Sequence, residues 1–140
     1  MSNFSNDGRR PHRVLIVDDD QEIRDIVTDV LTTSGYETLA ASRTDEALWL
    51  IEEHAPDVVI TDALMPGGDG RELCRIVKSD QRLANTKVII MTSLYKSPRY
   101  KYEAFRTFKA DDYLLKPVDF PQLLATLERL VPHARMSGAA

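Results

Sequence analysis

Acidic residues follow two short apolar segments of this chain, at the points where a buried strand would end. Three aspartates at positions 18–20 come directly after residues 14–17, and Asp62 comes directly after residues 58–61. Both segments are short and rich in β-branched residues, which is typical of strands buried on both faces of a parallel sheet. Carboxylates at the ends of two such strands would lie close together, where they repel one another unless a divalent cation lies among them. The pattern therefore predicts a cation site.

A hydroxyl and an amine occupy the equivalent place after two later apolar segments. Thr92 follows residues 87–91, and Lys116 follows residues 112–115. Clustered carboxylates form a hard oxygen site suited to Mg²⁺, which often binds phosphate oxygens as well. A cation, a lysine and a hydroxyl neutralise a phosphoryl group in transfer, and a carboxylate can itself attack phosphorus. Together these residues predict a site that accepts a phosphoryl group on one of its own aspartates.

Five predicted strands alternate with five predicted helices along the chain. The strands are expected at residues 13–18, 36–41, 57–61, 87–91 and 112–115. Helices are expected at residues 20–34, 44–54, 71–79, within 98–109, and from 121 onward, where apolar residues recur at helical spacing. This alternation is the pattern of an open, doubly wound α/β fold with a parallel sheet. Its right-handed crossovers place the loops that follow the strands at one edge, where such folds bind ligands.

Local signals refine this outline. We interpret Asp20 as a helix cap and not as a cation ligand, Thr44 as the cap of the second helix, and Asp69 as a turn former before the third. The apolar faces predicted for the first and third helices consist of Ile23, Ile26, Val27, Val30 and Leu31, and of Leu73, Cys74, Ile76 and Val77.

The composition is that of one globular domain. The chain has 140 residues, 43% of them hydrophobic and 29% charged. Its net charge of −4 argues against direct binding of nucleic acid. The single Cys74 suits a reducing cytoplasm, and no apolar segment approaches the roughly 18–20 residues that span a bilayer. We expect a cytoplasmic protein without membrane contact, with a flexible tail at residues 1–12, one domain at 13–131 and a second tail at 132–140.

The order and spacing of five motifs resemble those of the receiver domain of bacterial two-component response regulators. The motifs are Val17-Asp18-Asp19, Asp62-x-x-Met65-Pro66, Asp69-Gly70, Thr92-Ser93 and Tyr113-x-x-Lys116-Pro117. The resemblance covers residues 13–131 and implies a flavodoxin-like sheet in the strand order 2-1-3-4-5. It also implies a signalling switch rather than an enzyme with an external substrate.

The resemblance assigns roles to the residues at the sheet edge. It implies that Asp62 is the phosphoacceptor, with a sensor histidine kinase or a histidine phosphotransfer protein as the donor. Mg²⁺, for which Mn²⁺ may substitute, would be held by Asp18, Asp19, Asp62 and the backbone carbonyl of Leu64. Lys116 would reach the phosphoryl oxygens, Thr92 would bond to them after transfer, and Tyr113 would turn inward as Thr92 moves. Ser93 and Pro117 would support these residues, and the Lys116–Pro117 bond would be cis.

Residues 95–109 depart from the family pattern. They contain five aromatic residues and five basic ones against the single acid Glu103. We expect Tyr102, Phe105 and Phe108 to pack on the sheet, and Tyr95 and Tyr100 to be exposed. In the family, the fourth helix, fifth strand and fifth helix commonly form the output surface. The hypothesis is that Tyr95, Tyr100, Lys101, Tyr102 and Arg106 bind an acidic protein partner or mediate a phosphorylation-dependent dimer of an otherwise monomeric chain.

A second departure concerns the lifetime of the phosphorylated form. Leu64 and Leu94 stand two residues beyond Asp62 and Thr92, where related proteins carry polar residues that orient water. Two leucines would exclude water, which predicts an acyl phosphate that lasts minutes to hours.

Three other interpretations remain open. The chain could be a phosphorylation-independent pseudo-receiver that only binds partners, or a fragment of a larger hybrid kinase or regulator. It could also be a small aspartate-nucleophile phosphohydrolase, although such enzymes carry a second aspartate two residues after the nucleophile, where this chain has Leu64. The preferred interpretation is a stand-alone receiver.

Overall fold

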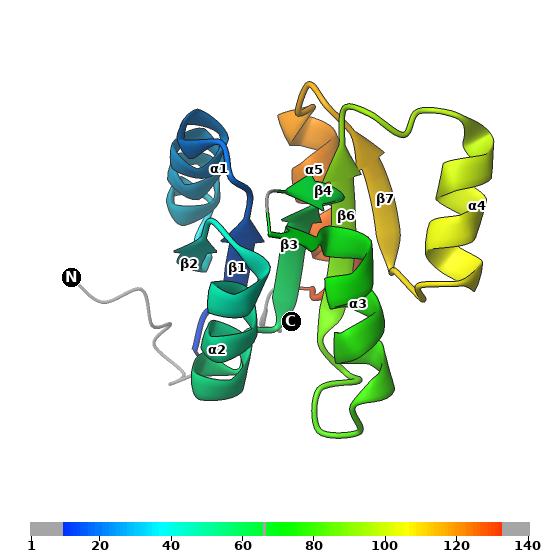
Figure 1. The fold of residues 1–140 in the computed structure, drawn as a ribbon. Helices are drawn as coiled ribbons and strands as arrows, with labels where there is room; N and C mark the ends of the chain where they lie inside the picture. Colours follow the sequence, from blue (N-terminus) through cyan, green and yellow to red (C-terminus); the bar gives the residue numbers. More distant parts are fainter. Residues whose placement is uncertain (1–9, 66, 133–140) are drawn as a thin grey trace.

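Five parallel strands form the central sheet. A computed structural model describes residues 10–65 and 67–132 of the chain. The strands of the sheet are β1 (Arg13–Val17), β2 (Glu37–Ala41), β3 (Val58–Asp62), β6 (Lys87–Thr92) and β7 (Asp112–Leu115). Their order across the sheet is β2-β1-β3-β6-β7 (Figure 1). Since β6 and β7 are the fourth and fifth strands of this sheet along the chain, the order is the expected 2-1-3-4-5 of a flavodoxin-like fold.

Five helices cover the two faces of the sheet. They are α1 (Gln21–Thr33), α2 (Thr44–His54), α3 (Gly70–Ser79), α4 (Pro98–Arg106) and α5 (Phe120–Leu130). Successive strand residues point to opposite faces, so Leu15 packs with α2, α3 and α4, whereas Ile16 packs with α1 and α5. Within the described ranges, no helix is both long enough and apolar enough to cross a lipid bilayer.

The register of the strands aligns their carboxyl ends. Val17 pairs with Thr61, Asp62 pairs with Met91, and Thr92 pairs with Leu115. The ladder continues beyond the last of these pairs, because the Lys116 backbone N–H donates to the Thr92 carbonyl at 2.9 Å. The residue that ends or follows each of four strands is therefore held at the same edge.

A small hairpin separates β3 from α3. It consists of β4 (Leu64–Met65) and β5 (Gly68–Asp69), which pair antiparallel. Pro66, which belongs to the predicted motif, lies outside the described residues, as do residues 1–9 and 133–140, which make up most of the two predicted tails.

The cap prediction is confirmed for α1 and wrong for α2. Asp20 Oδ1 accepts from the backbone N–H groups of Glu22 and Ile23 at 2.9 and 3.4 Å. The cap position of α2 is Arg43, which makes no side-chain cap bond, and Thr44 is already helical. The Thr44 side chain instead lies against Gly68, where a Cβ would stand only 2.2 Å from its hydroxyl oxygen. Contact with the hairpin thus takes the place of capping.

The predicted apolar faces are correct in their centres and wrong at their margins. Leu73, Cys74 and Val77 are fully buried on α3, but Ile76 and the α1 residue Ile26 are exposed. Each stands one helical position away from the buried stripe, so its side chain points past the sheet.

The aromatic residues around α4 are arranged opposite to the prediction. Tyr102 is 63% exposed and Phe105 is 36% exposed, because the small Ala104 is the residue that packs against the sheet. Tyr95 and Tyr100 are half-buried against the core instead of exposed. Phe108, which follows the end of the helix, is the exception, because it packs against the core as predicted.

Candidate functional site

Three carboxylates meet at the carboxyl edge of the sheet. Asp18 and Asp19 follow β1, and Asp62 is the last residue of β3. Each offers one oxygen, and these oxygens all lie within 4.8 Å of one another. The sequence-based expectation that acids from separate strands would converge is therefore met in the structure.

Asp18 is the most constrained of the three. It is buried, with 1% of its surface exposed. Its Oδ2 accepts from Lys116 Nζ at 2.6 Å, and its Oδ1 accepts from the Asp20 backbone N–H at 2.9 Å. A carboxylate in such surroundings stays charged only when cations and N–H donors replace the lost water. The ammonium group of Lys116 is one such cation.

Asp62 shares the same lysine at a longer distance. Its Oδ2 lies 3.5 Å from Lys116 Nζ. Burial raises the pKa of Asp62, the Lys116 charge opposes that rise, and the Asp18 charge adds to it. For Lys116, burial lowers the pKa, but the hydrogen bond and charges of Asp18 and Asp62 outweigh it and leave the pKa raised. One ammonium thus faces at least two carboxylates, and the site keeps an excess of negative charge.

The donor set fits a hard divalent cation. Three carboxylates from two loops present oxygens within 4.8 Å of one another, and Mg²⁺ prefers oxygen ligands of this kind. Asp18 is buried beside Asp62, so the two carboxylates repel each other. A bound cation would relieve this repulsion.

Gly70 fixes the loop that carries Asp62. Its N–H donates to the Ala63 carbonyl at 2.8 Å. A Cβ at Gly70 would stand 1.8 Å from the Asp62 carbonyl oxygen and 2.7 Å from Thr61 Oγ1, so only glycine permits this approach. This role was not predicted, although the glycine directly after Asp69 is a signal for it.

Asp69 and Leu64 face each other in the hairpin. The prediction that Asp69 is a turn former is refined, since it ends β5 and caps α3 by accepting from the Arg71 N–H at 2.8 Å. Leu64 pairs with Asp69 in the register of the hairpin, and its side chain is 45% exposed. A role of the Leu64 carbonyl as cation ligand stays a prediction.

The two candidate switch residues are both buried. Thr92 Oγ1 accepts from the Leu94 N–H at 3.1 Å, and the Tyr113 hydroxyl donates to the Tyr95 carbonyl at 2.5 Å. Tyr113 is 4% exposed, so its ring points inward. Burial raises the pKa of Tyr113 to about 12. Ser93, beside Thr92, is exposed, and the Lys116–Pro117 bond is cis as predicted.

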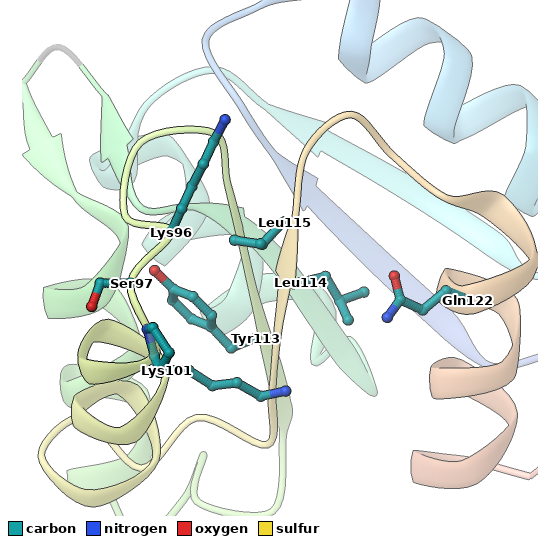
Figure 2. A pocket seen from close by; sticks show the side chains of 8 residues that line it. Lys96, Ser97, Lys101, Tyr113, Leu114, Leu115 and Gln122 are labelled. Carbon is teal, nitrogen blue, oxygen red and sulfur yellow. The ribbon is translucent and has the colours of Figure 1, made fainter.

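A pocket of about 350 Å³ lies between α4, β7 and α5, beside Tyr113. Figure 2 shows Tyr113 with Lys96, Ser97 and Lys101 around its ring, and Gln122 of α5 pointing towards Leu114. The residues that line the pocket are Lys96, Ser97, Pro98, Lys101, Tyr113, Leu114, Leu115 and Gln122. Of the five residues predicted as a partner surface, Lys101 lines this pocket and Tyr102 and Arg106 are exposed on α4. Tyr95 and Tyr100 instead pack against the core.

The fold and the acidic edge are those of a receiver type of signalling domain, and comparison with known proteins agrees. The family model for the response regulator receiver domain matches residues 14–128. The chain therefore belongs to the response regulator receiver domain family, whose members act as modules of two-component signalling.

Relatives of known sequence include one single-domain protein and several longer ones. The chain is 30% identical to the polar-differentiation response regulator DivK of Brucella anthropi, over 84% of this chain and 94% of DivK. It is 34% identical to the transcriptional regulatory protein GltR of Pseudomonas aeruginosa, over 89% of this chain and 50% of GltR. The chain thus spans about half the length of the longer curated relatives it matches.

Solved structures show the same fold. A putative response regulator from Chloroflexus aurantiacus is 33% identical, with a TM-score of 0.80 over 86% of this chain and 98% of that one. The chemotaxis response regulator CheY4 of Vibrio cholerae is 31% identical, with a TM-score of 0.79 over 86% of this chain and 99% of that one.

Proposed function

We propose that the chain is a phosphorylation-dependent switch that accepts a phosphoryl group on Asp62. The observation that carries the proposal is the convergence of Asp18, Asp19, Asp62 and Lys116 at one sheet edge, with oxygens and ammonium within a few ångströms. The donor is the phosphohistidine of a sensor kinase or of a phosphotransfer protein in the cytoplasm. No external substrate is turned over.

The transfer is an in-line displacement at phosphorus. An Asp62 carboxylate oxygen forms the new P–O bond while the P–N bond to the donor imidazole breaks. The electron pair of the P–N bond stays on the ring nitrogen, so the donor histidine leaves with a free imidazole. Asp18, Asp19, Asp62 and the Leu64 carbonyl would hold Mg²⁺ or Mn²⁺, and the bound ion would supply positive charge to the phosphoryl oxygens. Lys116 supplies positive charge as well, because its Nζ already lies 3.5 Å from Asp62 Oδ2.

The phosphoryl group then biases two arrangements of the loop after β6. It adds about −1.5 to −2 charge and three acceptors. The Thr92 hydroxyl, which accepts from the Leu94 N–H in this structure, donates to one of these acceptors and draws the loop towards the site. The inward position of Tyr113 is favoured as a consequence, and the α4–β7–α5 face is the output.

The output partner is an acidic protein segment. Lys96 and Lys101 line the pocket beside Tyr113. Tyr102 and Phe105 of α4 and Leu115 of β7 expose apolar surface. Tyr102 also lies under Arg106, whose guanidinium carbon is 5.6 Å from the ring centroid. A partner with carboxylates beside an apolar side chain complements this surface. The alternative to an acidic partner is a phosphorylation-dependent dimer formed through the same face, and a binding test would distinguish the two.

The direct test is phosphorylation in solution. The full chain is incubated with acetyl phosphate and Mg²⁺, and its intact mass is measured. We expect a mass gain of one phosphoryl group that depends on Mg²⁺ and is lost in Asp62→Asn. The matched control is Asp20→Asn, which alters an adjacent carboxylate that caps α1 and should leave the gain intact. A mass gain that persists in Asp62→Asn would refute the assignment.

A further inference from the structure

A row of side chains with two aromatic rings between two arginines links α3 to α4. The guanidinium carbon of Arg71 lies 4.5 Å from the centroid of the Tyr95 ring and 5.7 Å from that of Phe108. The rings of Tyr95 and Tyr100 lie 4.8 Å apart, and Arg99 lies 5.3 Å from the Tyr100 centroid on α4. We call Arg71, Tyr95, Tyr100 and Arg99 the Arg71 stack. It joins the start of α3, the loop after β6 and the first turn of α4.

One end of the stack is fixed to the loop that follows Asp62. Arg71 Nε and Nη2 donate to the two carboxylate oxygens of Asp69 at 3.1 and 2.8 Å. Asp69 also caps α3 and pairs with Leu64 in the hairpin. A two-pronged contact of this kind sets the plane of the guanidinium group as well as its position. Arg71 therefore presents a fixed flat surface to the Tyr95 ring.

Tyr95, within the stack, contacts Tyr113. Tyr95 stands three residues after Thr92, and its backbone carbonyl accepts the Tyr113 hydroxyl at 2.5 Å. The Tyr95 ring is held between Arg71 and Tyr100, so the position of its carbonyl is held as well. The inward placement of Tyr113 thus depends on a contact that begins on α3.

We propose that Arg71 is a positioning residue that sets the balance of the switch. By holding Tyr95, it favours the arrangement of residues 93–97 in which Tyr113 is turned inward, before any phosphoryl group is attached. This inference rests on the proposed function for the link between Tyr113 and phosphoryl binding, but not for the position of the ring itself. The Arg71 stack connects the loop that follows Asp62 to the α4–β7–α5 face by a route that does not pass through Thr92.

Two substitutions break the stack in different ways. Arg71→Ala removes the cation, while the Asp69 side chain still caps α3 through the Arg71 backbone N–H. Tyr95→Leu removes the ring but keeps the carbonyl that accepts from Tyr113, and it leaves the Arg71–Asp69 pair in place. Arg71→Lys keeps the charge without the planar fork. The matched control is Arg75→Ala, one turn further along α3, where the arginine pairs with Glu72 on the exposed surface.

Two measurements on the full chain test the proposal. The first is the fluorine NMR resonance of Tyr113 in protein labelled with 3-fluorotyrosine, assigned with Tyr113→Phe. The second is the affinity for beryllofluoride in the presence of Mg²⁺. We expect Arg71→Ala and Tyr95→Leu each to move the Tyr113 resonance towards the solvent-exposed position and to weaken beryllofluoride binding about five- to tenfold. The double variant should lose no more than either single one, because both remove the same contact.

Arg71→Lys should fall between the wild type and Arg71→Ala, and Arg75→Ala should match the wild type. An unchanged Tyr113 resonance in both Arg71→Ala and Tyr95→Leu would overturn the proposal, as would additive losses in the double variant. If the wild type itself fails to bind beryllofluoride, the proposed function fails, while the Tyr113 resonance still decides whether the stack positions the ring.

Discussion

The acidic edge and the α4 face of this molecule handle charge in opposite ways. At the edge, Asp18 is buried and its oxygens are bound by Lys116 and a backbone N–H. On α4, Lys101, Tyr102 and Arg106 are exposed to solvent. Chemistry at phosphorus needs charges that are fixed in advance and shielded from water, whereas recognition of a partner needs groups that can be reached. In the function proposed here, the buried edge would therefore perform the reaction and a separate, exposed face would report it.

The largest effect is expected from Lys116→Met. Loss of the ammonium group should slow phosphorylation by acetyl phosphate about 10²- to 10³-fold, because a preorganised positive charge beside the transferring group is removed. The rate is measured by quantifying the phosphorylated mass over time. Lys101→Met removes an equivalent charge from the α4 face and should leave the rate unchanged. Equal losses in both variants would erase the distinction between the two regions.

Gly70→Ala tests how tightly the loop that follows Asp62 is packed. The added methyl would stand 1.8 Å from the Asp62 carbonyl oxygen, so we expect the free energy of unfolding to fall by about 2–4 kcal/mol. The measurement is urea denaturation followed by circular dichroism. Gly67→Ala is the control, because Gly67 has φ +83° but no atom within 4 Å of an added Cβ. Its loss should be smaller, about 1–2 kcal/mol from backbone strain alone.

Charge reversal on α4 tests whether the proposed output surface binds a partner. The double change Lys101→Glu with Arg106→Glu should weaken capture of an acidic partner roughly tenfold, since both side chains lie beside exposed apolar groups. Phosphorylation of Asp62 should proceed at the wild-type rate. Partner affinity is measured by titration with the phosphorylated protein, and undiminished affinity would contradict the proposed surface.

A smaller effect is expected for the lifetime of the acyl phosphate. Leu64 and Leu94 are both exposed beside the site, and we predict that they exclude attacking water. Leu64→Asn should speed hydrolysis of the phosphorylated protein about tenfold by giving water a hydrogen-bonding partner. Loss of the phosphorylated mass over time measures the rate. Loss within seconds in the wild type would show that the leucines do not protect the bond.

Cys74 provides the smallest and most local test. Burial raises the pKa of its thiol from 9.0 to about 12, and its Sγ donates to the Phe108 carbonyl at 3.1 Å. The unfolded thiol loses its proton at lower pH than the folded one, so this group adds stability below pH 9.0 that is lost as pH rises towards about 12. Alkylation by iodoacetamide at pH 8 should accordingly be very slow in native protein and fast in urea. Fast native alkylation would show that the region beneath α4 opens readily.

The sequence predicted the fold and the convergence of the site, and it failed where tertiary packing decides. The alternation of strands with helices and the common edge follow from periodicity and from crossover rules, whereas the strand order was implied by the resemblance to the receiver family. Asp62 and Lys116 were therefore placed correctly although 54 positions separate them. The rotation of α4 about its axis was not predictable, because Tyr102 and Phe105 are more hydrophobic than Ala104, which nevertheless faces the sheet.

The remaining errors have the same origin. Thr44 is a good cap by composition, but its side chain contacts Gly68 across space. Tyr95 lies in a loop without periodicity, so nothing local indicated that Arg71 would cover its ring. Contacts between segments that are distant in sequence determine these positions, and the local pattern of a single sequence does not reveal such contacts.

The close approaches at Gly68 and Gly70 also bear on how this domain can be altered in the laboratory. The hairpin between β3 and α3 rests on Thr44 at one glycine and on the Asp62 backbone at the other. A fluorescent tag or epitope grafted into residues 63–70 would push on both supports at once. Attachment through Lys109, which is exposed outside the strands and helices, avoids both.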